Sequence, residues 1–530
     1  MKLRRFPQLM ILAAAVLALA MSPKAQAPKG GETGTPEFDS CTSILVGRLA
    51  SVDGSTMTSH SCDSGTDRTW MTIVPNMKHK PGETAKVYYE PKRTKGPNDP
   101  DRLETGEIPQ VAETYAYLNA AYPIMNEHQL AIGETTIGSR RELISENGII
   151  DAPELYRLVL ERAKTAREAI RVADELTKEY GYNDWGECFT FADTKEVWHF
   201  EIHGPGKGKK GAVWAAQRVP DGEIGVSANA GRIREIDLGD PDRFLASANV
   251  TSLAEEMGYW SKAGGRPFEF TYAYDPDSRT SLYCRRREWR VLSLLAPSLK
   301  LNPESENYPF SVKPDKKVGV ADLLAIFRDT YGGTEYDMTR TLTAVNRKGE
   351  TVKSPIATPF MSADALALFR LKRERTICCP AATYLQITQS RDWLPGPLGG
   401  VVWIGYDNPA TTPHLPFYIG ISQMPASYMV DGRWVFSREC AWWAFRTVSR
   451  LANFRYQEMS RDIEKVWKPI EDKALADQAQ FENDALELYK KDAKRFRERL
   501  TSYCQSLATQ AVQAYWKLGD DLWLKYSGQF

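Results

Sequence analysis

The sequence predicts a mixed α and β protein with a helical C-terminal extension. Three patterns indicate this class: a β-hairpin pattern at residues 42–61, short apolar strands between residues 189 and 229, and charged helical sequence from about residue 438 onward. The composition, 42% hydrophobic and 26% charged in a chain of 530 residues, is that of an ordinary globular protein. A chain of this length typically forms about two to four domains.

The first 40 residues are typical of an exported protein. Basic residues at the start precede an apolar run from Leu9 to Met21, and small residues follow it. This pattern predicts a secretory signal peptide over 1–27, because the run is too short to cross a bilayer, which takes about 20 residues. Residues 28–40 are small, polar and rich in Pro and Gly, which predicts a propeptide or linker. We therefore expect a periplasmic or extracellular protein without a membrane span.

The charge balance argues against one class of partner. Lys and Arg number 68, and Asp and Glu also number 68, so the chain has no net charge at pH 7. A nucleic-acid-binding protein normally carries a clustered excess of basic residues. The eight cysteines lack the paired spacing of a zinc or redox motif. We expect no nucleic-acid partner and no disulfide scaffold.

A β-hairpin is predicted to begin at Cys41. Thr42–Leu49 and Thr56–Ser61 have strand-forming composition, and Ser51–Ser55 between them contains an Asp-Gly turn. Cys41 therefore stands where the predicted linker ends and the first strand starts.

Helices and strands alternate after this hairpin. Apolar residues at helical spacing predict one helix over Asp151–Tyr180, capped by Asp151 and ended by Gly181. The C-terminal helical region is predicted to break at Pro469 and to resume as one long helix over Ala474–Leu518. The predicted strands lie at 189–192, 197–202, 212–219, 224–229, 382–387 and 401–406.

Two short motifs are weaker candidates for a functional site. Residues 206–211 have Gly-x-Gly-x-x-Gly spacing, but a dinucleotide fingerprint also requires a following helix, and here a strand is predicted. His199, Glu201 and His203 share one face of a predicted strand, and two imidazoles with a carboxylate could bind a metal. Ligands two apart on one strand point in parallel, however, so a polar strand face is the default. We predict no metal and no cofactor.

Cys41 is the candidate nucleophile. If the Ser40–Cys41 bond is cleaved, the new α-amine lies on the same residue as the thiol. An α-amine has a pKa of about 8, so it is partly neutral near pH 7 and can accept the thiol proton. His60 and Asp63 follow on the adjacent strand. The residues leave one alternative open, a non-catalytic binding protein in which Cys41 is paired with Cys62.

Longer segments carry a family resemblance. The stretch CTSILVGRLASVDGSTMTSHSCDS, from residue 41 to 64, resembles the start of the cysteine dipeptidases of peptidase family C69. These are N-terminal nucleophile hydrolases related to the choloylglycine hydrolases. Further similar segments follow in the family's order at 117–143, 180–206, 211–238 and 403–420.

The resemblance implies a fold and roles for individual residues. It implies an αββα sandwich, two sheets between helical layers, with a catalytic domain over 41–435 and a helical extension over 436–530. Cys41 matches the nucleophile, and Asp63 matches the acidic residue that holds the nucleophile's amine. Asn229 matches the asparagine whose amide helps to form the oxyanion hole. His60 stands where bile-salt-type relatives have an arginine, and the backbone near Thr135–Thr136 would supply the other oxyanion donor. The residues expected around the substrate are His60, Glu134, Thr135, Thr136 and Arg232.

The expected function is that of an exported cysteine-type dipeptidase. Self-cleavage would expose Cys41, and dipeptides would be the substrates. The alternative on the same fold is an N-acyl amide hydrolase of the bile-salt or penicillin V type. The C-terminal helices would cap the cleft, form a homo-oligomer contact or simply pack on the outer layer.

Overall fold

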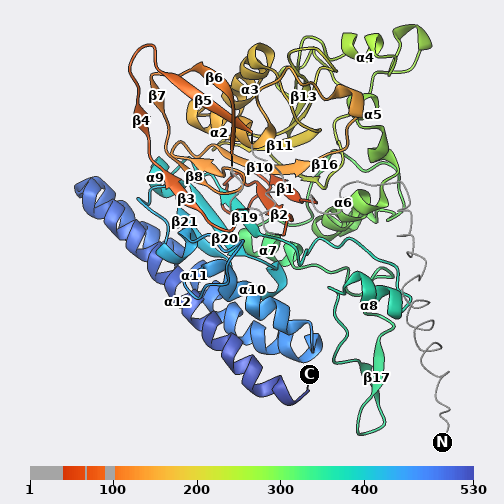
Figure 1. The fold of residues 1–530 in the computed structure, drawn as a ribbon, viewed down its shortest axis with the longest axis vertical. Coiled ribbons are helices and arrows are strands. Elements are labelled where there is room, and N and C mark those ends of the chain that lie inside the picture. The colour runs from red at the N-terminus through yellow and green to blue at the C-terminus, as the bar shows by residue number, and fades with distance from the viewer. Residues whose placement is uncertain (1–39, 66–67, 90–101, 530) are drawn as a thin grey trace, which may run out of the picture. The chain divides into compact units, whose positions relative to one another are not determined.

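The computed structural model describes residues 40–65, 68–89 and 102–529. The predicted signal peptide over 1–27 and the predicted linker over 28–40, apart from Ser40, lie outside these residues. Helices and strands are mixed along the described chain (Figure 1), which agrees with the predicted mixed class. Within the described ranges, no helix combines the length and apolar content that crossing a membrane requires.

One large sheet is antiparallel, and helices α2 (Ala152–Arg162) and α3 (Ala166–Tyr180) cover one of its faces. Trp198 and Phe200 on β12 point into this apolar layer, where they share a core with Leu155 of α2. Alternate residues of β12 therefore face opposite sides, as predicted. The strand order is β15 (Phe244–Ala246), β13 (Val213–Val219), β12 (Val197–His203), β11 (Glu187–Ala192), β10 (Ala131–Thr136), β9 (Met125–Asn126), β8 (Tyr117–Asn119) and β3 (Thr72–Val74).

A second sheet layer consists of two ladders that the hairpin at Cys41 joins. Isolated bridges from Thr42 to Ser61 and from Val46 to Met57 link β1 to β2. The predicted hairpin therefore forms, but its strands are shorter than predicted because each makes its continuous ladder with another strand. The ladders are β1 (Ser43–Val46), β14 (Ile224–Ser227) and β16 (Ser311–Val312), and β2 (Ser59–Cys62), β19 (Tyr384–Gln389), β20 (Val401–Tyr406) and β21 (Leu415–Tyr418).

The two sheets approach each other closely where β2 faces β10. The hydroxyl oxygens of Thr58 and Thr190 lie 2.5 Å apart across this gap. Gly133 allows the approach, because a Cβ at this position would lie 2.4 Å from the carbonyl oxygen of Ser59. The residue after Gly133 is Glu134, whose side chain contacts His60 of β2 at 2.9 Å.

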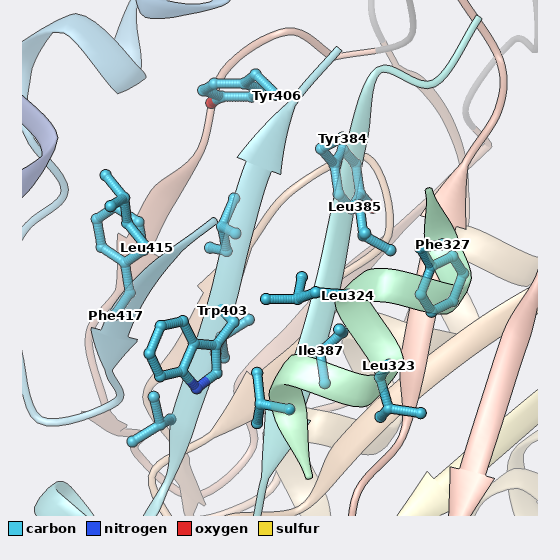
Figure 2. Packing of buried hydrophobic residues seen from close by; sticks show 14 of the residues in the cluster. Leu323, Leu324, Phe327, Tyr384, Leu385, Ile387, Trp403, Tyr406, Leu415 and Phe417 are labelled. Carbon is cyan, nitrogen blue, oxygen red and sulfur yellow. The ribbon is translucent and has the colours of Figure 1, made fainter. Parts of the chain in front are cut away.

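The second layer shares an apolar core with helices. Figure 2 shows Leu324 of α7 (Val320–Phe327) near Ile387 of β19, with Trp403 on the neighbouring β20. Helices α10 to α12 contribute to the same core. The predicted division into 41–435 and 436–530 stays a prediction.

The C-terminal region forms three helices, α10 (Ala441–Ala452), α11 (Tyr456–Lys491) and α12 (Ala493–Tyr526), which pack near β20 and β21 (Figure 1). The predicted break at Pro469 is wrong, because α11 continues through it. Pro469 is exposed, so water can satisfy the carbonyl that loses its N–H partner one turn earlier. The chain breaks instead at Asp492, whose carboxylate caps α12, and the single helix predicted over 474–518 is therefore two.

The single helix predicted over 151–180 is also two helices. Asp151 caps α2 by accepting a hydrogen bond from the Glu154 N–H at 2.9 Å, and Gly181 follows the end of α3 with φ of 77°. Both end signals are confirmed. Between the helices, Thr165 has an extended backbone, and its hydroxyl accepts from the Glu168 N–H at 3.2 Å. This N-cap starts a new helix without interrupting the apolar pattern.

Smaller elements surround these layers. The glycine motif at 206–211 lies in the loop between antiparallel strands β12 and β13, as predicted. The short helices are α4 (Ser252–Glu256), α5 (Phe270–Tyr274), α8 (Ala363–Leu368) and α9 (Gly396–Gly399), and α6 (Leu282–Leu295) is longer. The two-stranded sheets pair β4 (Met77–Lys78) with β7 (Glu113–Thr114), β5 (Thr84–Tyr89) with β6 (Leu103–Pro109), and β17 (Thr343–Val345) with β18 (Thr351–Lys353).

Candidate active site

Cys41 lies just before β1 and is buried, with 3% of its surface exposed. His60 on β2 and Glu134 on β10 converge on its sulfur, and the thiol, an imidazole nitrogen and a carboxylate oxygen lie within 4.8 Å of one another. We call these three residues the thiol cluster. His60 Nε2 and Glu134 Oε2 are 2.9 Å apart, and both side chains are fully buried. No disulfide joins Cys41 to Cys62 in the described residues, so the pairing that the non-catalytic alternative requires is not seen there.

The surroundings of the thiol cluster change its proton affinities. Burial raises the pKa of the Cys41 thiol well above its ordinary value, and the charge of Glu134 adds to this rise. Burial alone would also raise the pKa of Glu134, but its contact with His60 outweighs burial and lowers the pKa. A carboxylate oxygen of Glu134 lies within 4.8 Å of the Cys41 sulfur. Glu134 is therefore an ionised proton acceptor close to the thiol.

Asp63, the residue after β2, lies beside the nucleophile. Its charge acts to raise the pKa of the Cys41 thiol and its backbone N–H acts to lower it. Its Oδ2 accepts from the Arg375 guanidinium and, at 3.2 Å, from the Ser61 hydroxyl. Burial raises the pKa of Asp63 to about 6, although Arg375 and Arg287 act to lower it. The other oxygen, Oδ1, is buried and has no hydrogen-bond partner within the described part of the chain.

Arg287 on α6 connects Cys41 to Asn229. Its guanidinium is fully buried, and Nη1 donates to the Cys41 carbonyl at 2.7 Å and to the Thr42 hydroxyl at 3.0 Å. Nη2 donates to the Ala228 carbonyl at 2.9 Å and to Asn229 Oδ1 at 2.8 Å. A planar guanidinium suits this task because its donors are fixed in one plane. Arg287 thus ties the start of β1 to the end of β14.

Asn229 follows β14 and is only half-buried. Its φ of 63° lies in the left-handed region, which Asn adopts more readily than most residues. Its Nδ2 donates to the Thr136 carbonyl at 2.7 Å. The structure therefore brings Asn229 to the backbone of β10, where the second oxyanion donor was predicted.

The other residues expected around the substrate differ in burial and in their distance from the thiol. His60 and Glu134 are buried on the thiol, and Thr135 is buried with its hydroxyl against a serine of β14. Thr136 is half-buried and donates to Glu134 Oε1 at 3.2 Å. Arg232 pairs with Glu288 of α6 at 2.7 Å and lines a narrow polar cavity of about 20 Å³. The cavity also contains Gly231, two residues after Asn229.

The polar face of β12 forms a structural network. His199 Nε2 contacts Glu201 Oε1 at 2.8 Å, and this carboxylate also accepts the backbone N–H groups of residues 232–233. His203 contacts a serine hydroxyl at 3.1 Å, and burial lowers its pKa to about 4. Among the described residues, the thiol cluster meets the spacing of a metal site and this face of β12 does not. The default prediction of a polar strand face agrees with these contacts.

Sequence reasoning missed Arg287 and Arg375. Arg287 is the last of three consecutive arginines at 285–287, and Arg375 lies in the charged stretch 371–376. Such runs usually mark a solvated surface, because arginine is rarely fully buried unless it is paired. Both guanidinium groups are instead buried against the backbone around Cys41. No local signal distinguishes a buried arginine from an exposed one.

Comparison with known proteins identifies a family. The family model described as Peptidase family C69 matches residues 40–469. A protein named "Probable dipeptidase" from Latilactobacillus sakei is 26% identical over 405 residues, which cover 74% of this chain and 76% of that protein. One of the same name from Salmonella dublin is 25% identical over 442 residues (78% and 90%), and a "Dipeptidase" from Bifidobacterium longum is 24% identical over 458 residues (80% and 79%). Because the match covers most of the chain and contains the thiol cluster, this chain belongs to peptidase family C69 and is a hydrolase of peptide bonds.

Proposed function

We propose that this protein is an exported cysteine-type dipeptidase that cleaves its own Ser40–Cys41 bond, so that Cys41 becomes the N-terminal residue. Asp63 is the observation that carries the proposal. One of its oxygens is buried beside the nucleophile without a partner in the described residues, and such an oxygen is costly to bury. The α-ammonium of a freed Cys41 would supply the missing donors. The family match, which begins at residue 40, supports the same boundary.

The arrangement of layers supports the N-terminal nucleophile hydrolase fold. Helices α2 and α3, the eight-stranded sheet, the second sheet layer and the helices that pack on it follow the αββα order that the resemblance implies. The thiol cluster lies between the two sheets, with His60 on one and Glu134 on the other.

In the mature enzyme, the neutral α-amine takes the thiol proton and Cys41 attacks the substrate carbonyl. The Asn229 amide and the backbone near Thr136 stabilise the oxyanion, and one such donor contributes about 2.7–4 kcal/mol to lowering the barrier. The α-ammonium then protonates the leaving amine. Water, deprotonated by the same amine, hydrolyses the thioester. The protein's own residues carry every proton in this sequence.

Dipeptides are proposed as substrates because the relatives are named dipeptidases. Export is supported by the signal-peptide pattern over 1–27. Assembly of the protein as a homo-oligomer stays a prediction, which size-exclusion chromatography with light scattering tests.

The test combines the intact mass of the protein purified from an exporting host with a substrate panel. We expect a chain that starts at Cys41 and hydrolyses dipeptides. Cys41→Ala should keep residues 28–40 and be inactive, whereas Cys504→Ala, a change of another buried cysteine on α12, should mature and work normally. Turnover of N-acyl amides alone would identify the rival amidase. Full dipeptidase activity in a chain that retains Ser40 would refute the proposed nucleophile.

A further inference from the structure

Buried arginines hold both carbonyl groups around the Ser40–Cys41 bond. Arg375 donates from Nη2 to the Ser40 carbonyl oxygen at 2.6 Å and from Nε to the Ser40 hydroxyl at 3.1 Å. Arg287 donates to the next carbonyl, that of Cys41. The carbonyl that self-cleavage would attack is therefore already paired with a guanidinium.

Arg375 carries a stable positive charge at this position. Its side chain is 9% exposed. Burial alone would lower the pKa of Arg375, but the acidic groups around it, chiefly Cys379 and Asp63, raise it above the ordinary value. A buried charge needs a partner, and Asp63 Oδ2 provides one while other guanidinium N–H groups contact Ser40. A fixed, desolvated cation aimed at a carbonyl oxygen is the arrangement that stabilises an oxyanion.

We propose that Arg375 is a catalytic residue of self-cleavage that stabilises the oxyanion formed on Ser40 when Cys41 attacks. This inference rests on the proposed function and extends it. Asn229 instead contacts the Thr136 carbonyl and the Arg287 guanidinium. The chain thus has one oxyanion donor for its own maturation, Arg375, and a separate one for substrate, Asn229.

The step balances without any further reactant except water. The Cys41 sulfur forms a bond to the Ser40 carbonyl carbon while its proton passes to Glu134, whose carboxylate oxygen lies within 4.8 Å of the sulfur. The carbonyl π electrons move to the oxygen, beside Arg375. On collapse, the bond from the Ser40 carbon to the Cys41 nitrogen breaks, and this nitrogen takes the proton from Glu134. Water then hydrolyses the thioester to the Ser40 carboxylic acid and the Cys41 thiol.

A purely structural role for Arg375 makes a different prediction. If Arg375 served only to hold Asp63, then Asp63→Asn would slow self-cleavage as much as Arg375→Met does. If Arg375 acts on the Ser40 carbonyl, Asp63→Asn should have the smaller effect, because the 2.6 Å contact to the carbonyl remains. The two variants therefore separate positioning from catalysis.

The test follows self-cleavage in full-length chains made by cell-free translation, with intact mass measured over time. Arg375→Met removes the donors, and Arg375→Lys keeps the charge. Arg391→Met is the matched control, because the Arg391 side chain is only 4% exposed, against 9% for Arg375, pairs with Glu482 at 2.8 Å and lies outside the thiol cluster. We expect the control to cleave at the wild-type rate and Arg375→Met to cleave about 10²–10³-fold more slowly, as for the loss of an oxyanion donor.

Hydroxylamine, which cleaves thioesters and spares amides, identifies the affected step. Arg375→Met chains should resist hydroxylamine, because their thioester does not form. Release of the leader from these chains by hydroxylamine would overturn the inference, as would wild-type cleavage rates in both Arg375 variants. If Arg375→Met does not fold, as judged by thermal unfolding, the self-cleavage rate of Arg375→Lys decides whether Arg375 acts on the Ser40 carbonyl. A wild-type chain that never breaks the Ser40–Cys41 bond would refute the proposed function instead.

Discussion

Replacing Arg287 by methionine should lower kcat mainly by releasing Asn229. Arg287 Nη2 holds Asn229 Oδ1 at 2.8 Å, and Nη1 holds the Cys41 carbonyl at 2.7 Å. Asn229 has φ of 63°, a conformation that residues other than glycine adopt uncommonly, so a fixed partner helps to keep its amide in place. Methionine retains an apolar stem of similar length and removes every donor. Arg287 is thus a positioning residue that acts through Asn229.

The size of the effect follows from two contributions. A hydrogen bond to a charged group contributes about 1.5–3 kcal/mol, which sets the energy that holds Asn229. Loss of an oxyanion donor raises the barrier by about 2.7–4 kcal/mol, or about 10²–10³-fold in kcat. We therefore expect a decrease of about 10²-fold for Arg287→Met, not exceeding the effect of Asn229→Ala.

The assay is dipeptide hydrolysis per molecule that starts at Cys41, counted by intact mass, so that slow maturation does not count as low kcat. In a double-mutant cycle, Arg287→Met combined with Asn229→Ala should be no slower than Asn229→Ala alone, a coupling of about 1.5–3 kcal/mol. The control is Arg290→Met on the same helix, where Arg290 pairs with Asp329 at 2.7 Å. It should lower the Tm and leave kcat unchanged. Additive effects in the double variant would refute the reasoning.

Other changes test the buried charges and the thiol. Glu134→Gln breaks the buried contact with His60 and should lower the free energy of unfolding in urea by about 3–5 kcal/mol; an unchanged midpoint would contradict this. Burial raises the pKa of Asp63 to about 6, so the folded, uncleaved Cys41→Ala protein holds this proton more tightly than the unfolded chain does. Asp63 should therefore lower the free energy of unfolding by about 2 kcal/mol as pH rises from about 4 to 6. Adding Asp63→Asn should remove this share and leave that of Asp275, whose pKa burial also raises to about 6. Iodoacetamide should abolish dipeptidase activity while EDTA leaves it intact; loss of activity in EDTA would indicate a metal in the thiol cluster.

Local pattern predicted much of the fold, and its errors have physical causes. The strands from β11 to β14 were predicted from apolar runs, and Asp151 and Gly181 from their capping chemistry. The break before α3 was missed because Thr165 starts a new helix while the apolar spacing continues across it. The helix break predicted at Pro469 is wrong because this proline is exposed to water inside α11. The solvent exposure of a residue cannot be deduced from its neighbours in the sequence.

In the candidate site, too, the sequence predicted some residues and missed others. Cys41, Asp63 and Asn229 could be predicted because each lies in a long segment that resembles the family. His60 and Glu134 were predicted as substrate contacts, whereas the structure places them, fully buried, on the sulfur. No pattern indicated Arg375, because its partners lie more than 300 residues earlier in the chain.

The sequence by itself determined the mixed class, the hairpin that begins at Cys41 and the cysteine that heads it, because hydrophobic period, turn residues and caps act over a few neighbouring positions. Only the tertiary structure decided which charges surround that cysteine. The close approach of β2 and β10 at Gly133 and the burial of Arg287 and Arg375 gather groups from distant segments. Their effect on the thiol depends on exclusion of water, which is a property of the packed layers and not of any one segment.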